Sequence, residues 1–598
     1  RVVPSLRDLL ELRVAAPADI SPDGTTVLVK SNLTGTMQLY RVTAAGGALE
    51  QLTDFAEPVD GFFVPRRQRI LLQMDEGGNE RHQLYLLDAD PGGVLEPLVV
   101  EPDVLHRTPS CTRDGRLLAY ATTRRNGIDF DIVVRDLETG DEHVAFARGG
   151  WCEAAGFSPD GAMLTVSRAT ERSGDNDLYL VDVASGEVSL ALPHEDEAYV
   201  GAPAWLPDGT GFYVATSAGR DLVGIARYNL RSHSWQYVIE DRWDLECHVD
   251  EAGRNLLVEA NVDGYSRLEL RDPATLEPRD EVALPGRGVV SDVVFSRDGR
   301  FVAYHFTSPL VAGDTWLYDV QSGESVRLTT SPGAVAPEEL AEPELHRFSS
   351  FDGETVPVFL YLPPGPGPFP VVIMIHGGPE SQLRPIFNPL AQYFVAAGYA
   401  VAAPNVRGST GYGKRYEHLD DVGKRLDAGR DLVSLHDWLA RDGRIDRDRA
   451  VLYGGSYGGY MVLAGLAFHP ERWAAGVETV GISSLVTFLE NTAEWRRAFR
   501  EREYGSLERD RQFLEEVSPL RHVEAIRAPL FVIHGANDPR VPVGEAEQIH
   551  RSLTQRGIRC ELLVYPDEGH GLARLHNRLD AYPQAVAFLE EVLGAPER

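Results

Sequence analysis

The stretch YGGSYGGYM (453–461) places four glycines around one serine, Ser456, directly after the apolar run 450–452. Its centre matches the pattern G-x-S-x-G. In a nucleophile elbow the serine sits on a sharp strand-to-helix turn, where side chains two residues away on either side would clash, so glycine is needed there. The stretch therefore predicts a nucleophilic serine at the end of a buried strand. The alternative is a glycine-rich loop with an incidental serine.

Apolar runs typical of strands buried on both faces surround this motif, with helical stretches between them such as 431–440 and 543–555. The runs are PVVIMIH (370–376), YAVAAP (399–404), AVLYGG (450–455), AAGVETV (474–480), PLFVIHG (529–535) and CELLVYP (560–566). Such alternation predicts an α/β-hydrolase-like domain built on a doubly wound, mostly parallel sheet. The segment FSSFDGETVPVFLYLP (348–363) precedes it and indicates a hairpin.

The first half of the chain repeats a turn signature at intervals of about 46 residues. The copies are SPDG (21–24), TRDG (112–115), SPDG (158–161), LPDG (206–209) and SRDG (296–299), with degenerate copies at 65–68 and 250–253. A short strand of the LYLVD type follows each copy. Seven such units predict a seven-bladed β-propeller, and a β-sandwich with regular turns is the alternative.

The repeat stops near residue 330, and SPGAVAPEELAEPE (331–344) reads as a linker. We therefore expect a two-domain chain, because 598 residues exceed the size at which one hydrophobic core usually divides. The propeller is assigned to residues 20–332 and the hydrolase domain to residues 333–598.

Composition excludes several function classes. A formal charge of −32 argues against a nucleic-acid partner, and no apolar run approaches the length of a membrane helix. The four cysteines form no C-x-x-C pair and neighbour no metal-ligand cluster, so we expect free thiols, no metal and a cytoplasmic setting. The first residues do not form a signal peptide. Because the chain begins at Arg1, a removed targeting segment stays an open alternative.

A nucleophilic serine needs a base, and the base needs an acid that orients it. In α/β-hydrolases these partners follow in the order Ser, Asp, His, on loops after later strands. Asp538 follows the strand FVIHG, and His570 follows the strand ELLVYP. We predict Ser456, Asp538 and His570 as the catalytic triad.

Three other residues compete for these roles. His534 precedes Asp538 and ends a strand, which suits a structural hydrogen bond better than a base. Asp567 and Glu568 lie so close to His570 in sequence that either would have to curl back to reach Nδ1. Asp538 and His570 therefore remain the predicted acid and base.

The oxyanion of an acyl-transfer intermediate needs two preorganised donors. One is the backbone N–H of Tyr457, the residue after the nucleophile. The second is expected from the loop His-Gly-Gly-Pro at 376–379, where glycines let the backbone approach a substrate. We predict Gly378 as this donor.

Five motifs together resemble one family. HGGP (376–379), NVRGSTGYG (405–413), GGSYGGYM (454–461), HGANDPRVP (534–542) and PDEGHG (566–571), behind a seven-bladed propeller, are similar to the prolyl oligopeptidase family. Within it, the acylaminoacyl-peptidase branch is the most similar. The resemblance covers nearly the whole chain.

The resemblance implies a propeller that lies as a lid over the hydrolase, with the active site between them. It also implies an N-terminal helix, assigned to residues 1–19, that packs on the hydrolase, and SLRDLLEL (5–12) has suitable leucines. Arg540, two residues after the predicted acid, would hold a substrate carbonyl. The specificity pocket would be formed by the segment that contains Val486, Phe488 and Trp495.

These features predict a serine peptidase that cleaves short peptides through an acyl-enzyme, releases a terminal, N-acylated residue and needs no cofactor. A homo-oligomer is left open. A carboxypeptidase or an oligo-endopeptidase of the same family remains an alternative, and a carboxylesterase or an inactive scaffold fits less well. Glu80 is the nearest thing to a glutamate that would bind a free amino terminus. The arginines that could instead bind a carboxylate are Arg81, Arg124, Arg125 and Arg267.

Overall fold

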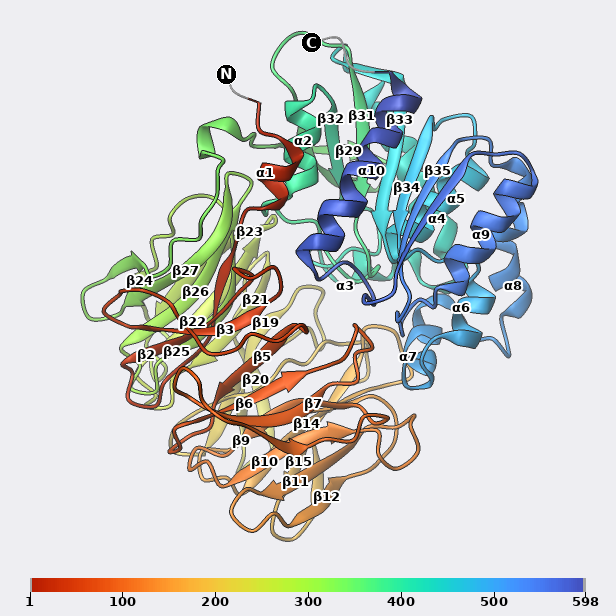
Figure 1. Cartoon of the computed structure of the whole chain (residues 1–598). Coiled ribbons are helices and arrows are strands. Elements are labelled where there is room, and N and C mark those ends of the chain that lie inside the picture. Colours follow the sequence, from red (N-terminus) through yellow and green to blue (C-terminus); the bar gives the residue numbers. More distant parts are fainter. Residues whose placement is uncertain (1–2, 595–598) are drawn as a thin grey trace.

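The computed structural model describes residues 3–594, in which a ring of antiparallel sheets lies beside a layered α/β unit (Figure 1). The ring is a seven-bladed β-propeller, and each blade is a four-stranded sheet of consecutive strands. The first four blades are β1 (Ala15–Ile20), β2 (Thr26–Ser31), β3 (Gln38–Thr43) and β4 (Glu50–Gln51); β5 (Val59–Phe63), β6 (Arg69–Met74), β7 (Gln83–Asp88) and β8 (Leu95–Val99); β9 (His106–Cys111), β10 (Leu117–Thr122), β11 (Asp131–Asp136) and β12 (Glu142–Phe146); and β13 (Cys152–Phe157), β14 (Met163–Ala169), β15 (Asn176–Asp182) and β16 (Val188–Ala191). The last three are β17 (Ala204–Trp205), β18 (Gly211–Thr216), β19 (Gly224–Asn229) and β20 (Ser234–Ile239); β21 (Asp244–Val249), β22 (Leu256–Val262), β23 (Tyr265–Arg271) and β24 (Pro278–Glu281); and β25 (Val289–Phe295), β26 (Phe301–Ser308), β27 (Val311–Asp319) and β28 (Glu324–Arg327).

The repeated turn joins the first strand of each blade to the second. In the first blade the hydroxyl of Ser21 donates to Asp23 at 2.6 Å, and Gly24 has a φ of 74°. L-residues rarely adopt this left-handed conformation, which is why the signature ends in glycine. The degenerate copies at 65–68 and 250–253 occupy the same place, between β5 and β6 and between β21 and β22.

The ring closes by packing of its first blade against its last. Strand β1 lies against β25, β26 and β27, and the hydroxyl of Thr315 donates to the carbonyl of Ala15 at 3.1 Å. Since every blade consists of consecutive strands, the two end blades share no ladder hydrogen bonds with each other.

The predicted boundary at residue 19 is wrong, because β1 begins at Ala15 and belongs to the first blade. The SPDG turn needs a strand on both sides, and β1 is that first strand. The helix itself, α1 (Leu6–Leu10), is capped by the Ser5 side chain and buries Leu6 and Leu10 in the core of the α/β unit. Figure 1 shows α1 beside α2 (Pro389–Ala396) and α10 (Leu575–Leu593). Residues 1–2 and 595–598 of the predicted domains lie outside the described residues.

The α/β unit is built on an eight-stranded sheet in the order β29-β30-β32-β31-β33-β34-β35-β36. The first two strands pair antiparallel, and β31 to β36 run parallel. The strands are β29 (Glu344–Ser349), β30 (Thr355–Tyr361), β31 (Phe369–Ile375), β32 (Ala400–Pro404), β33 (Ile445–Gly455), β34 (Ala475–Thr479), β35 (Leu530–Gly535) and β36 (Cys560–Tyr565). Between the units, β28 ends at Arg327 and a short helix η1 (Pro337–Glu339) precedes β29.

Helices cover both faces of this sheet and create two hydrophobic cores. Helices α1, α2 and α10 bury apolar side chains on one face. The remaining helices are α3 (Lys414–Glu417), η2 (His418–Asp420), η3 (Val422–Lys424), α4 (Arg425–Leu439), α5 (Tyr457–Phe468), α6 (Leu485–Asn491), α7 (Glu494–Tyr504), α8 (Arg511–Glu516), η4 (Pro519–Ala525) and α9 (Gly544–Gln555). Alternate residues of β31 point to opposite cores, with Ile373 in one and Val372 in the other. Within residues 3–594, the helices are too short or too polar to cross a bilayer.

Candidate active site

Ser456 lies between β33 and α5 with φ 55° and ψ −120°, a conformation that L-residues avoid. The flanking glycines explain how the chain holds it. A Cβ on Gly458 would lie 2.3 Å from the carbonyl oxygen of Ile375, and one on Gly454 would lie 2.5 Å from the carbonyl oxygen of Gly458. The turn is thus a nucleophile elbow rather than a loose glycine-rich loop.

The three residues predicted as a triad form one hydrogen-bonded chain. The Nε2 of His570 lies 2.9 Å from the Oγ of Ser456, and its Nδ1 lies 2.8 Å from the Oδ2 of Asp538. When Nδ1–H donates to the carboxylate, Nε2 is left to accept the hydroxyl proton of the serine. This geometry fits a serine activated by a histidine base.

Asp538 is fully buried and fixed by its own loop. Its Oδ1 accepts the backbone N–H groups of Arg540 at 2.9 Å and Val541 at 3.0 Å, which leaves Oδ2 for His570. The competing histidine, His534, is fully buried with its Nε2 2.7 Å from the carbonyl oxygen of Val541, and burial lowers its pKa. His534 therefore supports the loop and does not face Ser456.

The competing acids hold the loop that follows His570. Glu568 accepts the backbone N–H groups of Ala573 and Arg574, both at 3.1 Å. Asp567 accepts the amide of Asn577 at 2.9 Å. Their oxygens are used in these contacts, so Asp538 is the acid that reaches the imidazole.

One predicted oxyanion donor follows the serine directly, and the other lies on the loop that approaches it. Tyr457 is the first residue of α5, where backbone N–H groups have no acceptor within the helix. Gly378 lines the cavity described below, and the hydroxyl of Tyr504 donates to its carbonyl at 3.3 Å. This contact helps to fix the loop. The loop lies close to Ser456, since a Cβ on Gly377 would lie 3.4 Å from the serine Cβ.

A buried ionic cluster supports the elbow from behind. The fully buried guanidinium of Arg425 donates to Asp420 at 2.7 Å and to Glu503 at 2.6 Å, and it stacks on the rings of Tyr457 and Tyr504. Burial raises the pKa of Asp420 to about 7, although Arg425 acts in the opposite direction. The cluster fixes the ring of Tyr457 and hence the start of α5.

The same cluster contains the one group of acidic side chains in the described chain with metal-site spacing. Oxygens of Asp420, Asp421 and Glu503 lie within 4.8 Å of one another. Arg425 already supplies positive charge to two of these carboxylates, and repulsion by its guanidinium disfavours a cation beside it.

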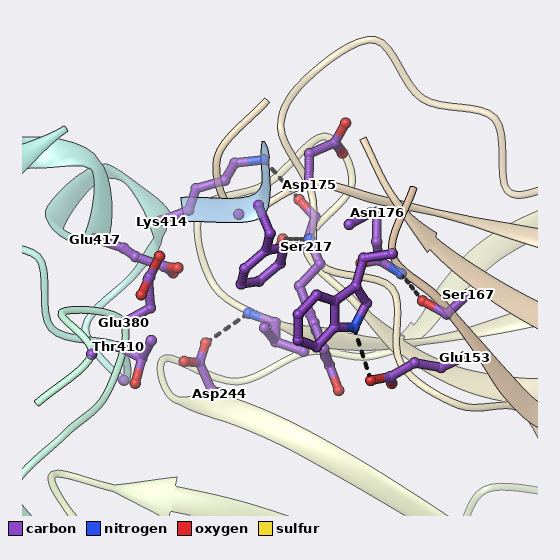
Figure 2. A pocket seen from close by; sticks show the side chains of 18 of the residues that line it. Glu153, Ser167, Asp175, Asn176, Ser217, Asp244, Glu380, Thr410, Lys414 and Glu417 are labelled. Atoms are coloured by element: carbon purple, nitrogen blue, oxygen red, sulfur yellow. Dashed lines mark hydrogen bonds between the residues drawn. The ribbon is translucent and has the colours of Figure 1, made fainter. Parts of the chain in front are cut away.

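A cavity of about 1050 Å³ lies between the propeller and the α/β unit. In Figure 2 the labelled side chains come from both units: Glu380, Thr410, Lys414 and Glu417 from the α/β unit and Glu153, Ser167, Asp175, Asn176, Ser217 and Asp244 from the propeller. Gly378 and Arg540 line it as well, so the cavity extends to the loops next to the triad, and the triad residues themselves are not among its lining residues. Both units thus form the chamber that a substrate would occupy.

Arg540 faces this cavity and binds the propeller. Its Nε lies 2.8 Å and 2.9 Å from the two carboxylate oxygens of Glu80, and its Nη2 donates to the same carboxylate. Although burial lowers the pKa of Arg540, the hydrogen bonds to Glu80 raise it, so the guanidinium stays charged. Glu80 itself has a φ of 59°, a left-handed backbone conformation that L-residues seldom adopt.

The residues predicted for the specificity pocket separate into two groups. Val486 and Phe488 lie on the buried face of α6 in the hydrophobic core, and neither lines the cavity. Their apolar character reflects packing of a short helix, and the sequence does not distinguish this from a pocket. Trp495 does line the cavity, where its ring lies 5.4 Å from that of Trp151 of the propeller.

The four arginines that the sequence offers as a carboxylate clamp each have an acidic partner in the propeller. Arg81 pairs with Asp103, Arg124 with Glu101, Arg125 with Asp131 and Arg267 with Asp241. These four are absent from the described residues that line the cavity. The arginines that do line it near Arg540 are Arg107, Arg496 and Arg500. No motif or periodicity marks them in the sequence.

An α/β sheet with a serine elbow and a Ser–His–Asp chain defines a serine hydrolase. Comparisons with known proteins identify the family within this class. Residues 385–596 match the model of the prolyl oligopeptidase family, and residues 59–331 match that of the prolyl oligopeptidase N-terminal β-propeller domain. The chain belongs to the prolyl oligopeptidase family and is a serine peptidase.

Individual relatives differ in how much of the chain they match. Dipeptidyl aminopeptidase BIII of Pseudoxanthomonas mexicana is 27% identical over 97% of this chain and 87% of its own length. The human acylamino-acid-releasing enzyme is 27% identical over 42% of this chain and 36% of its own. A solved structure of puromycin hydrolase superposes with a TM-score of 0.87 at 20% identity, covering 99% of this chain and 97% of that one, which shows a shared fold.

Proposed function

We propose that this peptidase releases a unit from the N-terminal end of short peptides, and that the preferred unit is an N-acylated residue. The observation that carries the proposal is the link between the triad and the Arg540–Glu80 pair, because the Asp538 carboxylate accepts the backbone N–H of Arg540 and Arg540 lines the chamber between the two units. A substrate chain end would enter this chamber and meet Arg540 next to the scissile bond.

The chemistry follows from the hydrogen bonds at Ser456. His570 removes the Oγ proton as the oxygen attacks the carbonyl carbon, and the imidazolium is stabilised by Asp538. The N–H groups of Tyr457 and Gly378 hold the oxyanion. His570 then returns the proton to the leaving amine, and a water molecule attacks the acyl-enzyme by the same route in reverse.

The charges beside Ser456 favour a blocked amino terminus. Glu80 is committed to Arg540, and Glu380 is bound by Arg500 at 2.7 Å. Glu153 is bound by Arg107 at 3.0 Å. A free ammonium group would therefore compete with a guanidinium for each carboxylate, whereas a neutral acyl group would need no counter-charge.

A dipeptidyl aminopeptidase is the second candidate. The relative that matches nearly the whole chain, propeller included, carries that name, and the propeller supplies Glu80. In this alternative the carboxylate of Glu80 would bind both the free ammonium group of the substrate and the guanidinium group of Arg540.

Size selection also belongs to the proposal. The chamber lies between two units of one chain, so entry requires their separation or passage along the propeller axis. We expect peptides up to a few dozen residues to be cleaved and folded proteins to be excluded.

The four cysteines are unpaired, which supports a reducing, cytoplasmic setting.

The test is a length series of one peptide sequence, free and N-acetylated, read by mass spectrometry, with Ser456→Ala as the blank. Release of the first acetylated residue supports the proposal. Release of dipeptides from the free series alone supports the second candidate. Rapid internal cleavage of unfolded casein would contradict both.

A further inference from the structure

Arg496 is a guanidinium group without a partner on the cavity wall. It lies on α7, and within residues 3–594 its buried Nε has no hydrogen-bond acceptor. No ion pair in that range involves its side chain. A buried donor of a charged group that makes no hydrogen bond costs free energy, so the unpaired Nε of Arg496 needs an explanation.

The carboxylates near Arg496 already serve other arginines. Glu80 binds Arg540, and Glu380 binds Arg500. On the propeller side Glu153 binds Arg107. Of the four guanidinium groups in this part of the wall, three are thus paired with a carboxylate, and Arg496 is the one without such a pair.

The surroundings make the positive charge of Arg496 unfavourable. Burial, followed by repulsion from Arg540 and Arg500, lowers the pKa of Arg496 to about 9. The negative charge of a bound anion would act against the repulsion from Arg540 and Arg500 and raise the pKa of Arg496.

Arg496 is tied to the reaction site through the start of α7. The backbone N–H of Ala493 donates to the carbonyl of Pro539 at 2.9 Å, and the hydroxyl of Thr492 donates to that of Arg540 at 2.6 Å. One turn further along, Arg500 holds Glu380, two residues beyond Gly378. The helix thus runs from the loop of Asp538 to the loop of the predicted oxyanion donor.

Two indole rings flank the guanidinium on the cavity wall. The Cζ of Arg496 lies 5.5 Å from the ring centre of Trp495 and 5.8 Å from that of Trp151. These contacts hold the guanidinium in place without neutralising it.

We propose that Arg496 is the subsite for a carboxylate of the peptide substrate, close to the scissile bond. The carboxylate can come from an aspartate or glutamate side chain, or from the C-terminus of a very short peptide. A guanidinium group suits it because its fork of donors matches the two oxygens of a carboxylate. The inference rests on the proposed peptidase function and adds the class of residue that the enzyme selects.

The test compares isosteric substrates. Ac-Glu-Ala-Ala-Ala and Ac-Gln-Ala-Ala-Ala, each as the free acid and the amide, are cleaved by the wild type, Arg496→Gln and Arg496→Lys. Arg509→Gln is the matched control, since Arg509 is an exposed arginine outside the cavity lining. Thermal unfolding shows that each variant is folded.

We expect the wild type to prefer the Glu peptides over the Gln peptides by about tenfold or more in kcat/KM. The preference should fall to about twofold or less in Arg496→Gln, and stay unchanged in Arg509→Gln. A preference for the free acids that Arg496→Gln abolishes would also support the subsite and identify the terminal carboxylate as its ligand.

Two results would overturn the inference: no preference for either carboxylate in the wild type, or a preference that survives in Arg496→Gln. The cleavage positions, read by mass spectrometry, report independently on release from the N-terminal end. The proposed function can therefore fail while the carboxylate preference is observed. Equally, the carboxylate preference can be absent while release from the N-terminal end is observed.

Discussion

Replacing Arg540 with alanine should damage peptide hydrolysis far more than ester hydrolysis. The guanidinium would hold a backbone carbonyl of the peptide, and an aryl acetate has no such carbonyl. A hydrogen bond to a charged group contributes about 1.5–3 kcal/mol, which corresponds to about 10- to 150-fold in kcat/KM. Because the side chain is 42% exposed, we expect the lower half of this range for peptides, and about threefold or less for the ester.

A second variant separates substrate binding from support of the structure. Arg540→Ala leaves the carboxylate of Glu80, which is only 19% exposed, without its partner. Adding Glu80→Gln removes this unpaired charge, so the double variant should recover thermal stability without recovering peptide hydrolysis. The two single variants and the double variant form a double-mutant cycle.

The assays are kcat/KM for an N-acetylated peptide and for an aryl acetate, with thermal unfolding of every variant. Equal losses on both substrates would refute the assignment of Arg540 to the substrate carbonyl. Recovery of peptide hydrolysis in the double variant would do the same, because it would show that only the unpaired Glu80 had caused the loss.

Three further expectations concern the elbow and its surroundings. Ser456→Ala should lose peptide and ester turnover while it unfolds at the wild-type temperature, and any residual rate should be at most about 10³–10⁴ over water; near-normal turnover would remove Ser456 from the mechanism. Gly458→Ala should fold poorly, since the added Cβ would lie 2.3 Å from the carbonyl oxygen of Ile375, and a stable, active variant would contradict the elbow geometry. Burial raises the pKa of Glu478 from 4.5 to about 8, so between these pH values the folded state keeps a proton that the unfolded state has lost and stability falls as pH rises. The melting temperature of Glu478→Gln relative to wild type should therefore increase from about pH 5 to pH 8, and a constant difference would argue that this carboxyl is ionised in the fold.

The elbow and its partners could be predicted because backbone geometry restricts them. Gly454 and Gly458 are required wherever a strand turns into a helix this tightly, and Asp538 and His570 follow apolar strands that are visible as runs. The propeller was predictable for a similar reason, since each blade repeats a turn that needs glycine or a substitute at positive φ.

The partners of the site across the interface were not predictable in the same way. Glu80 is 460 positions from Arg540 in the chain, and no local pattern records which loop of a blade will face the hydrolase. Arg496 and Trp495 lie on a helix whose next turns are equally rich in arginine. The sequence cannot decide the role of Val486 and Phe488, because an apolar helix face has the same sequence pattern whether it fills a core or lines a pocket.

The seam between the first and last blades has a mechanical consequence. Each other pair of neighbouring blades is joined covalently by a loop, whereas these two are joined by packing and hydrogen bonds. Each of the two is also tethered to the α/β unit, by the docked α1 on one side and by the segment after β28 on the other. The two tethers meet, since the N–H of Arg13 donates to the carbonyl of Pro332 at 3.4 Å. The catalytic unit thus reinforces the closure of the ring that covers it, and detaching Leu6 and Leu10 from its core would leave the seam held only by the contacts between the two blades.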